Sequence, residues 1–332
     1  MFPVEETVMV YGANGHTGRF VVTELRRQGF VPILSGRDEG RLKALGTEVR
    51  PAPVDDPGAL DRAMADAAAV INCAGPFATT AGPVIEAALR AGIPYVDVAA
   101  EIEANADTFA RFADRAREAG VAVVTAMAFF GGLADLLATT AMGDWTAADE
   151  AHVAYGLSSW HPTPGTRMAG QVSGERRNGR RVRFTKGELA YHDDEPPTLR
   201  WPFPEPMGPR EVIAEFTMAD VVTIPSHLPI PEVRSYMTVE AAQDLAAPDT
   251  PAPVAGSGQT FLVDVVVRSG GEERRAAASG RDIYAVSAPL VVEAVRRVLT
   301  GRTATTGVAS AGKIFDAPDF LRALSAHLKL LG

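Results

Sequence analysis

The chain has 332 residues, 46% hydrophobic and 22% charged, with one cysteine and a formal net charge of −9. Its length allows two domains with buried cores, and the lone Cys73 excludes a disulfide framework and a cysteine-built metal site. The negative balance disfavours nucleic-acid binding, while an acidic start and the lack of a long apolar run predict a soluble, cytoplasmic protein without membrane span or secretory signal.

The first 142 residues alternate short apolar runs with helical patterns, an order typical of a parallel sheet with crossover helices. Asp38 and the pair Asp56-Pro57 have residue types that begin helices. We also expect helices at residues 79–91 and 105–119. The expected strands are 7–11, 31–35, 49–54, 69–73, 95–98 and 121–125. This order predicts an α/β fold with a doubly wound parallel sheet of the Rossmann type.

From about residue 150 to 280 the pattern changes to short alternating runs, which predict a largely antiparallel sheet. Residues 269–272, Ser-Gly-Gly-Glu, predict a hairpin turn within it. Segments 196–209 and 246–258 are rich in proline and predict loops, and helical patterns return at 286–300 and 317–330. The alternating runs are 152–157, 181–184, 212–216, 234–239 and 260–267.

A glycine loop, residues 12–18, lies between the first expected strand and the first helix. Gly12 would permit a tight turn, Gly15 would let backbone approach a pyrophosphate, and Gly18 would let the helix pack close to the strand. The free N–H groups at the helix start would then bind the phosphates. We place Asn14, His16 and Thr17 in the same site, where His16 and Thr17 would donate to phosphate or cap the helix. The alternative is a tight turn without a ligand.

The end of the second expected strand bears on the choice between NAD and NADP. Enzymes that use NAD usually place an acidic residue there, whereas this chain has Ser35-Gly36-Arg37. The Arg37 guanidinium suits the 2′-phosphate of NADP(H), with Ser35 beside it, and the alternative is an ordinary surface arginine. Asp55, at the end of the third strand, is a candidate for contact on the adenine side.

A second turn, Cys73-Ala74-Gly75-Pro76-Phe77, follows the fourth expected strand at the edge where such folds bind ligands. The backbone of Ala74 and Gly75 would pass along the cofactor ribose, with Pro76 in the same turn and Phe77 facing the nicotinamide side. Cys73 on an apolar strand is more typical of core packing than of a nucleophile.

Taken together, these segments resemble the saccharopine dehydrogenase-like family of NADP-binding oxidoreductases. The resemblance is densest in the first 140 residues and continues in the last part of the chain. It is carried by residues 12–18, 35–37, 54–55, 72–77, 95–101, 280–284, 301 and 307–308.

The resemblance implies a Rossmann-type dinucleotide-binding domain formed by residues 1–142 and 281–332. A mixed α/β domain at residues 143–280, for substrate binding and dimerisation, would interrupt it. NADP(H) would be the cofactor and a homodimer the assembly; relatives include saccharopine reductases, imine reductases and trans-acting enoyl reductases. The chain departs from the family pattern at Ala99-Ala100 and at residues 129–135, which differ from the Asp-Ser-Pro-like run of the enoyl branch.

Two side chains are candidates for proton donation in such a reductase. Glu101 lies just past the fifth strand on the ligand edge, and its alternative is a carboxylate that begins a helix. His161 lies in the stiff loop 159–166, where Trp160 would cover the nicotinamide, and an ordinary packed loop is the alternative. We place Trp160 and Phe130 among the substrate-binding residues. Metal-ligand spacings and the Tyr-x-x-x-Lys pair of short-chain dehydrogenases are absent from the sequence.

The sequence favours an NADPH-dependent reductase that transfers hydride to the imine C=N of a small molecule. One alternative is a trans-acting enoyl reductase on a carrier-bound acyl chain, and another is a non-enzymatic NADPH-sensing regulator. A cluster of arginines would dock an acyl carrier protein or a carboxylate substrate in the enoyl alternative, although such runs are usually solvated. The cluster comprises Arg176, Arg177, Arg180, Arg181 and Arg183.

Overall fold

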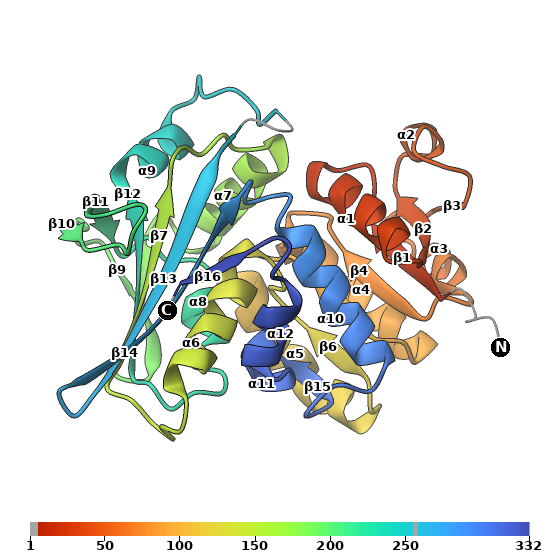
Figure 1. Ribbon diagram of the computed structural model, residues 1–332. Helices are drawn as coiled ribbons and strands as arrows, with labels where there is room; N and C mark the ends of the chain where they lie inside the picture. Colours follow the sequence, from red (N-terminus) through yellow and green to blue (C-terminus); the bar gives the residue numbers. More distant parts are fainter. Residues whose placement is uncertain (1–5, 255–257, 332) are drawn as a thin grey trace.

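The computed structural model describes residues 6–254 and 258–331, which form two sheets with helices packed around them (Figure 1). The acidic residues 1–5 and part of the predicted loop 246–258 lie outside the described residues. Among those described, no helix has the length and apolar character required to cross a membrane.

The first sheet is parallel throughout, and its strand order is β15-β6-β5-β4-β1-β2-β3. The order reverses direction at β1, where β2 pairs on one side and β4 on the other, so the loops that follow β1 and β4 lie at the switch point where open α/β sheets bind ligands. Its strands are β1 (Thr7–Tyr11), β2 (Val31–Gly36), β3 (Val49–Pro51), β4 (Ala69–Asn72), β5 (Tyr95–Asp97), β6 (Ala122–Val124) and β15 (Gly307–Ala309).

Helices cover both faces of this sheet because its strands are apolar on both sides. Val8 and Val10 face a core that includes α1 and α10, whereas Met9 faces α3, α4 and α5. Asp38 and Asp56 cap α2 and α3 through their side chains, as predicted. The helices are α1 (His16–Arg27), α2 (Glu39–Lys43), α3 (Pro57–Met64), α4 (Phe77–Ala91), α5 (Ile102–Glu118) and α10 (Ser287–Leu299).

The second sheet has the order β10-β11-β12-β7-β13-β14-β16, with β8 and β9 attached through β12. Its pairs are antiparallel except β12 with β7, and β13 and β14 form the predicted hairpin across Gly270 and Gly271. Its strands are β7 (Glu150–Leu157), β8 (Arg181–Thr185), β9 (Glu188–His192), β10 (Thr198–Trp201), β11 (Arg210–Ala214), β12 (Glu232–Thr238), β13 (Thr260–Ser269), β14 (Glu272–Arg281) and β16 (Lys329–Leu331).

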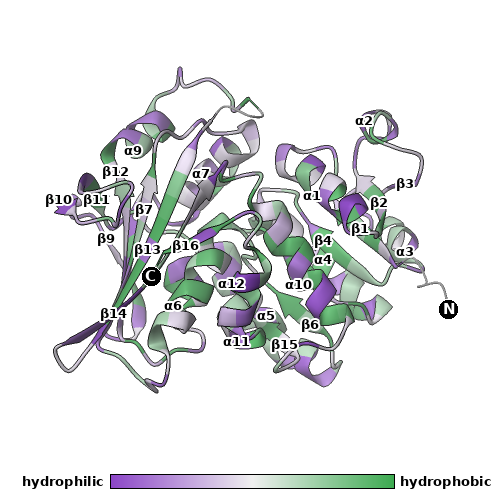
Figure 2. Ribbon diagram, viewed as in Figure 1, coloured by the Kyte–Doolittle hydropathy of each residue, from purple (hydrophilic) through white to green (hydrophobic). Residues whose placement is uncertain are grey.

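The two faces of the second sheet pack differently. Val153 and Val263 face the helices and belong to the same apolar core as Val10 of the first sheet, so a continuous core joins the two sheets (Figure 2). The opposite face carries a smaller cluster around Trp201 and Tyr236. The remaining helical segments are η1 (Phe129–Leu133), α6 (Ala134–Met142), α7 (Pro164–Arg176), α8 (Asp220–Thr223), α9 (Val239–Ala246), α11 (Ala311–Ile314) and α12 (Ala317–Ala323).

Among the elements that differ from the sequence prediction are the last helix, β10 and the third strand. The helix expected at 317–330 ends at Ala323, because the backbone of residues 329–331 instead pairs with the open edge of β14. The predicted loop 196–209 contains β10, which is held by its pairing with β11 and by the Trp201 Nε1–H bond to Asp264. The third strand, at the edge of the first sheet, is shorter than expected, because its pairing with β2 ends at Pro51.

Candidate active site at the carboxyl edge of the parallel sheet

The loops that follow β6, β5, β4 and β1 are neighbours at one edge of the first sheet, because the strands lie side by side in that order. Side-chain and backbone contacts join each loop to the next. Asp97, the last residue of β5, accepts the N–H of Ala126 after β6 at 2.8 Å, and Glu101 accepts the N–H of Phe77 after β4 at 2.9 Å. The four loops therefore form one connected surface.

The glycine loop has the geometry of a phosphate cradle. Gly12 has a φ of +83°, and a Cβ there would come within 2.8 Å of the Ala74 nitrogen. A Cβ on Gly18 would lie 2.2 Å from the Gly12 carbonyl oxygen, so both glycines are required by close backbone packing. Around Gly15, by contrast, the Gly12 carbonyl oxygen at 3.2 Å is the one neighbour within 4 Å among the described atoms.

No side chain of the described residues caps the start of α1, whose N-cap is Gly15. The first N–H groups of a helix have no intrahelical acceptor, so this end offers donors and a positive dipole to an anion. His16, Thr17 and Asn14 are half-buried around it. Burial lowers the pKa of His16, whose neutral ring packs edge-on against Tyr284 with centroids 5.1 Å apart. This cradle fits a pyrophosphate.

At the end of β2, Ser35 and Arg37 have different surroundings. The Ser35 hydroxyl is buried and donates to the Arg50 carbonyl oxygen at 2.7 Å, while its own carbonyl accepts from the glycine loop. Arg37 is exposed and makes no hydrogen bond or ion pair with any described residue. The charges of Arg37 and exposed Asp55 both act on the Tyr11 hydroxyl, whose pKa burial raises to about 12. Arg37 follows β2 and Asp55 lies past the end of β3, the two strands on one side of β1.

The turn after β4 is fixed by a buried polar network. The Ala74 N–H donates to the Asn72 side chain at 3.0 Å, and the Thr80 hydroxyl donates to the Ala74 carbonyl oxygen. Gly75 is exposed and Pro76 is half-buried. Burial raises the pKa of the Cys73 thiol, which disfavours the thiolate and agrees with core packing.

Glu101 is the most distinctive titratable group at this edge. It precedes α5, but its carboxylate caps the first N–H of α4, at Phe77, instead of its own helix. The residue is 8% exposed, and burial raises the pKa of its carboxyl from 4.5 to about 7. A carboxyl with this pKa is partly protonated near neutral pH and can donate a proton.

Aromatic side chains gather where the second domain meets this edge. Phe130, in η1 after β6, stacks on Trp160 with ring centroids 5.1 Å apart. The turn at Phe130 is pinned by the fully buried Asp220, which accepts the N–H of Gly131 at 3.0 Å and the Tyr155 hydroxyl at 2.6 Å. Burial raises the pKa of Asp220 to about 6. The structure thus brings together Phe130 and Trp160, the two predicted substrate-binding residues.

Tyr284 joins the second domain to the glycine loop, and the sequence prediction did not include it in the site. Its hydroxyl oxygen accepts Trp160 Nε1–H at 3.1 Å and lies 3.0 Å from the Thr166 hydroxyl. Its ring contacts His16. The segment 280–284 was singled out only for its resemblance, and an aromatic residue two positions before the predicted helix 286–300 carried no further signal.

His161 lies in the loop that Tyr284 holds. Its backbone carbonyl oxygen accepts from the Tyr284 hydroxyl at 3.3 Å, and its half-buried ring makes no hydrogen bond with a described residue. The loop ends at α7, a helix absent from the sequence prediction, although Thr163 as cap and Pro164 at the first position are a standard start signal. The imidazole is therefore held near Trp160 by its backbone and remains available to a ligand.

The arginine cluster that follows α7 is mostly neutralised within the chain. Arg176 pairs with Asp107, Arg177 with Glu103, and Arg183 with Asp194 and Glu215, which leaves Arg180 over the Tyr191 ring and Arg181 exposed. The residues that the structure describes contain no group of three or more His, Cys, Asp or Glu side chains placed to hold a metal ion.

Comparison with known proteins identifies the first domain. Residues 8–124 match the family model of the saccharopine dehydrogenase NADP-binding domain. This match confirms the family resemblance and the NADP-binding domain that the sequence predicts.

Curated relatives match the same part of the chain. A probable mitochondrial saccharopine dehydrogenase-like oxidoreductase of Arabidopsis thaliana is 33% identical over 147 residues, which are 38% of this chain and 32% of the relative. A saccharopine dehydrogenase-like oxidoreductase of Bos taurus is 28% identical over 39% of this chain and 35% of its own length. The chain thus matches about a third of the length of these relatives.

A solved structure is similar over nearly the full chain. The apo histidine-tagged saccharopine dehydrogenase (L-Glu forming) from Saccharomyces cerevisiae aligns with a TM-score of 0.67 over 98% of this chain and 100% of its own. The sequence identity is 11%, so the likeness concerns the fold. It confirms the predicted class, a Rossmann-type sheet with a second mixed domain.

Proposed function

We propose that this chain, whose residues 8–124 match a saccharopine dehydrogenase NADP-binding domain, is an NADPH-dependent reductase of small-molecule imines. The observation that carries the proposal is Glu101, a nearly buried carboxyl with a pKa of about 7 on the loop edge that also holds the glycine cradle. A proton donor next to a dinucleotide site is what reduction of a C=N bond needs besides hydride.

The residues that would hold NADPH come from three loops. The start of α1 would bind the pyrophosphate, Arg37 the 2′-phosphate, and the backbone of residues 74–77 the ribose next to the nicotinamide. Asp55 would lie on the adenine side. When bound, NADPH would supply the hydride, and NADP⁺ would be the product.

Glu101 would supply the proton that balances this reaction. The hydride adds to the imine carbon, the carboxyl proton passes to the nitrogen, and the C=N double bond becomes a C–N single bond in an amine. Solvent then reprotonates the carboxylate. The Phe77 N–H, which donates to one carboxylate oxygen at 2.9 Å, would orient the group throughout.

The second domain would cover the substrate. Trp160 and Phe130 form a stacked apolar pair that excludes water, and His161 beside them is a second candidate for proton transfer. The two donors differ in anchoring, because the Glu101 carboxylate has a fixed backbone donor whereas the His161 ring has no such partner among the described residues.

The test is NADPH consumption across a panel of cyclic imines, amine–carbonyl mixtures and enoyl thioesters. We expect turnover with imines, a fall of at least a hundredfold in kcat for Glu101→Gln, and an unchanged Kd for NADPH. Glu118→Gln, exposed near the other end of α5, is the matched control and should keep full turnover. His161→Ala is the parallel variant, and a larger loss there than in Glu101→Gln would transfer the proton-donor role to the histidine.

Two results would replace the proposal. Turnover with enoyl thioesters alone would favour the carrier-bound acyl reaction. Tight NADPH binding without consumption in the presence of any member of the panel would favour a sensing role. The pairing of Arg176, Arg177 and Arg183 within the chain gives the acyl alternative no support from this structure.

A further inference from the structure

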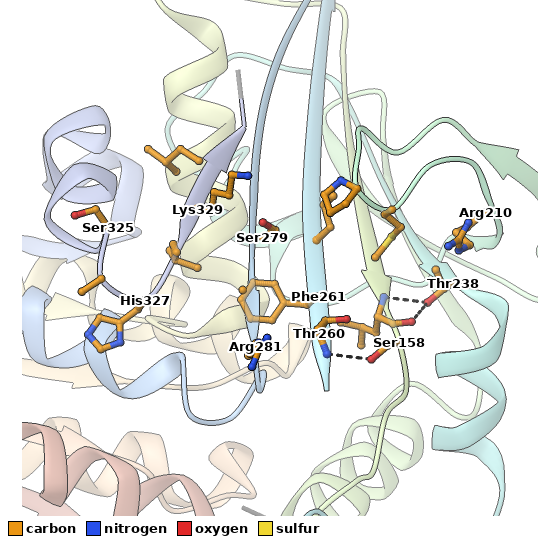
Figure 3. A pocket seen from close by; sticks show the side chains of 18 of the residues that line it. Ser158, Arg210, Thr238, Thr260, Phe261, Ser279, Arg281, Ser325, His327 and Lys329 are labelled. Carbon is orange, nitrogen blue, oxygen red and sulfur yellow. Dashed lines mark hydrogen bonds between the residues drawn. The ribbon is translucent and has the colours of Figure 1, made fainter. Parts of the chain in front are cut away.

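A groove with a volume of about 1410 Å³ lies at the end of the second sheet, away from the loops that would bind the cofactor (Figure 3). It crosses the ends of β7, β13 and β14. Residues 206–210 line it on one side, and the C-terminal segment 325–330 lines it on the other. No residue of the glycine loop or of the turns after β4 and β5 lines it, so it is a separate feature.

The strand register places two cations on the same face of this sheet end. Lys329 pairs with Ser279, and two residues further along β14 Arg281 pairs with Thr260. Directly paired residues share a face, and so do residues two apart on one strand. Lys329 and Arg281 therefore flank the Ser279 and Thr260 hydroxyls, with Ser158 next to Thr260.

The charge of the groove is opposite in sign to that of the whole chain. Its lining includes Arg210, Arg281, Arg322 and Lys329, against one acidic residue, Glu240, whereas the chain has a net charge of −9. Lys329 and Arg281 make no ion pair or side-chain hydrogen bond with any described residue, and Arg210 bonds only to the Pro209 carbonyl oxygen within that part of the chain. Cations left without carboxylates beside hydroxyl donors suit an anion.

The groove also begins close in sequence to Trp160, which would cover the substrate, and to Tyr284, which holds it. Ser158 precedes Trp160 by two residues, and Arg281 precedes Tyr284 by three. Consecutive Cα atoms are 3.80 Å apart, so the Arg281 and Tyr284 Cα atoms are separated by at most roughly 11 Å. The groove and the residues proposed to cover the substrate are therefore neighbours in space.

We propose that this groove binds an anionic end of the substrate, through phosphate or carboxylate oxygens held by Arg281 and Lys329. The Ser158, Thr260 and Ser279 hydroxyls donate to the same anion. The assignment of this anion as part of the substrate rests on the proposed reductase function. The binding of an anion in the groove does not depend on it.

The experiment is calorimetric titration of the full chain, saturated beforehand with NADPH so that the α1 cradle is occupied, with two probes, tripolyphosphate and citrate. We expect one site per chain, a loss of at least tenfold in affinity for Arg281→Ala and for Lys329→Ala, and no change for Arg200→Ala, an exposed arginine on β10 outside the groove. A preference for tripolyphosphate assigns a phosphate-bearing ligand, and a preference for citrate assigns a carboxylate. If neither probe binds, or if both groove variants bind like the unmodified chain, the assignment is wrong.

Two further measurements separate anion binding in the groove from cofactor binding and from self-association. NADPH affinity should be unchanged in both groove variants, because Arg37 and the glycine loop lie elsewhere. Sedimentation should give the same assembly mass for all variants; a change of mass together with the absence of probe binding would identify the groove as an interface between copies and overturn the proposal. Failure of imine turnover would reject the reductase function while leaving probe binding intact.

Discussion

The two sheets of this molecule provide positive charge to ligands in different ways. At the carboxyl edge of the parallel sheet, backbone N–H groups at the start of α1 provide it, and Arg37 is the added side chain. At the end of the second sheet, side chains such as Arg281 and Lys329 provide it through strand register. Backbone donors need glycines at fixed positions, whereas side-chain donors need only the correct pairing of strands.

Net charge does not predict which part of the chain binds an anion. Residues 1–150 carry 12 basic and 21 acidic side chains, a net of −9, and residues 151–332 carry 20 of each. The more acidic half nevertheless contains the proposed site for a polyanion. Local geometry determines where an anion binds, and the excess acidic residues lie on solvated helix faces such as that of Asp61 and Glu86.

The largest expected effect is a pH-dependent change in the free energy of unfolding, caused by Glu101 at the carboxyl edge of the parallel sheet. The Glu101 carboxyl has a pKa of about 7 in the folded chain and about 4.5 when unfolded, so its contribution to stability is complete below pH 4.5 and is lost as pH rises through 7. Glu101→Gln should match the unmodified chain near pH 4.5 and exceed its free energy of unfolding by about 3 kcal/mol at pH 8. Urea denaturation across this range measures the difference. Equal pH profiles of the free energy of unfolding for the two proteins would reject the raised pKa. Glu118→Gln is the control and should follow the unmodified chain at every pH.

The second prediction separates two glycines of the cradle. Gly18→Ala places a Cβ 2.2 Å from the Gly12 carbonyl oxygen and should lower the free energy of unfolding by about 2–3 kcal/mol. Gly15→Ala meets that oxygen only at 3.2 Å, so it should keep most of the stability while weakening NADPH binding by blocking the phosphates. Thermal denaturation and NADPH titration of both variants test this contrast. Loss of stability in both, or of binding in neither, would show that the loop is not a phosphate cradle.

The third prediction concerns the link between the two sheets. Tyr284→Phe removes the acceptor of Trp160 Nε1–H and the hydroxyl between Thr163 and Thr166, so it should cost about 2 kcal/mol of stability. Tyr191→Phe, at an exposed tyrosine, is the control and should change stability by less than about 0.5 kcal/mol. Equal stability of the two variants in denaturant would mean that the Tyr284 hydroxyl does not hold the loop.

The sequence predicted the glycine loop at the start of α1 in more detail than the groove of the second sheet, for a physical reason. The three glycines stand in a recognisable spacing between a strand and a helix, Gly18 is required by contact with Gly12 only six residues earlier, and the strands around them are apolar on both faces, so local pattern was sufficient. The groove depends on Lys329 lying opposite Ser279, fifty residues earlier in the chain. The local pattern there predicted a helix, and only pairing with β14 overrides it.

Residues whose partners are distant in sequence were the ones that local reasoning missed. Asp220 and Tyr284 have ordinary neighbours, and their importance comes from Gly131 and Trp160, which lie far away in the chain. Glu101 was predicted as a candidate from its place after β5, but its contact with Phe77 and its burial appear only in the folded chain. The start of α7 is different, since Thr163-Pro164 was a readable signal.

The most direct test of the central claim, that the carboxyl edge of the parallel sheet binds NADPH through the α1 cradle and Arg37, is calorimetric titration with NADPH and NADH. The unmodified chain should prefer NADPH, and Arg37→Ala should lower NADPH affinity about tenfold, equal to about 1.4 kcal/mol, without changing NADH affinity. Arg41→Ala, at an exposed arginine paired with Asp38, should leave both affinities unchanged. Equal affinity of the unmodified chain for the two nucleotides, or an equal loss for both in Arg37→Ala, would contradict this account.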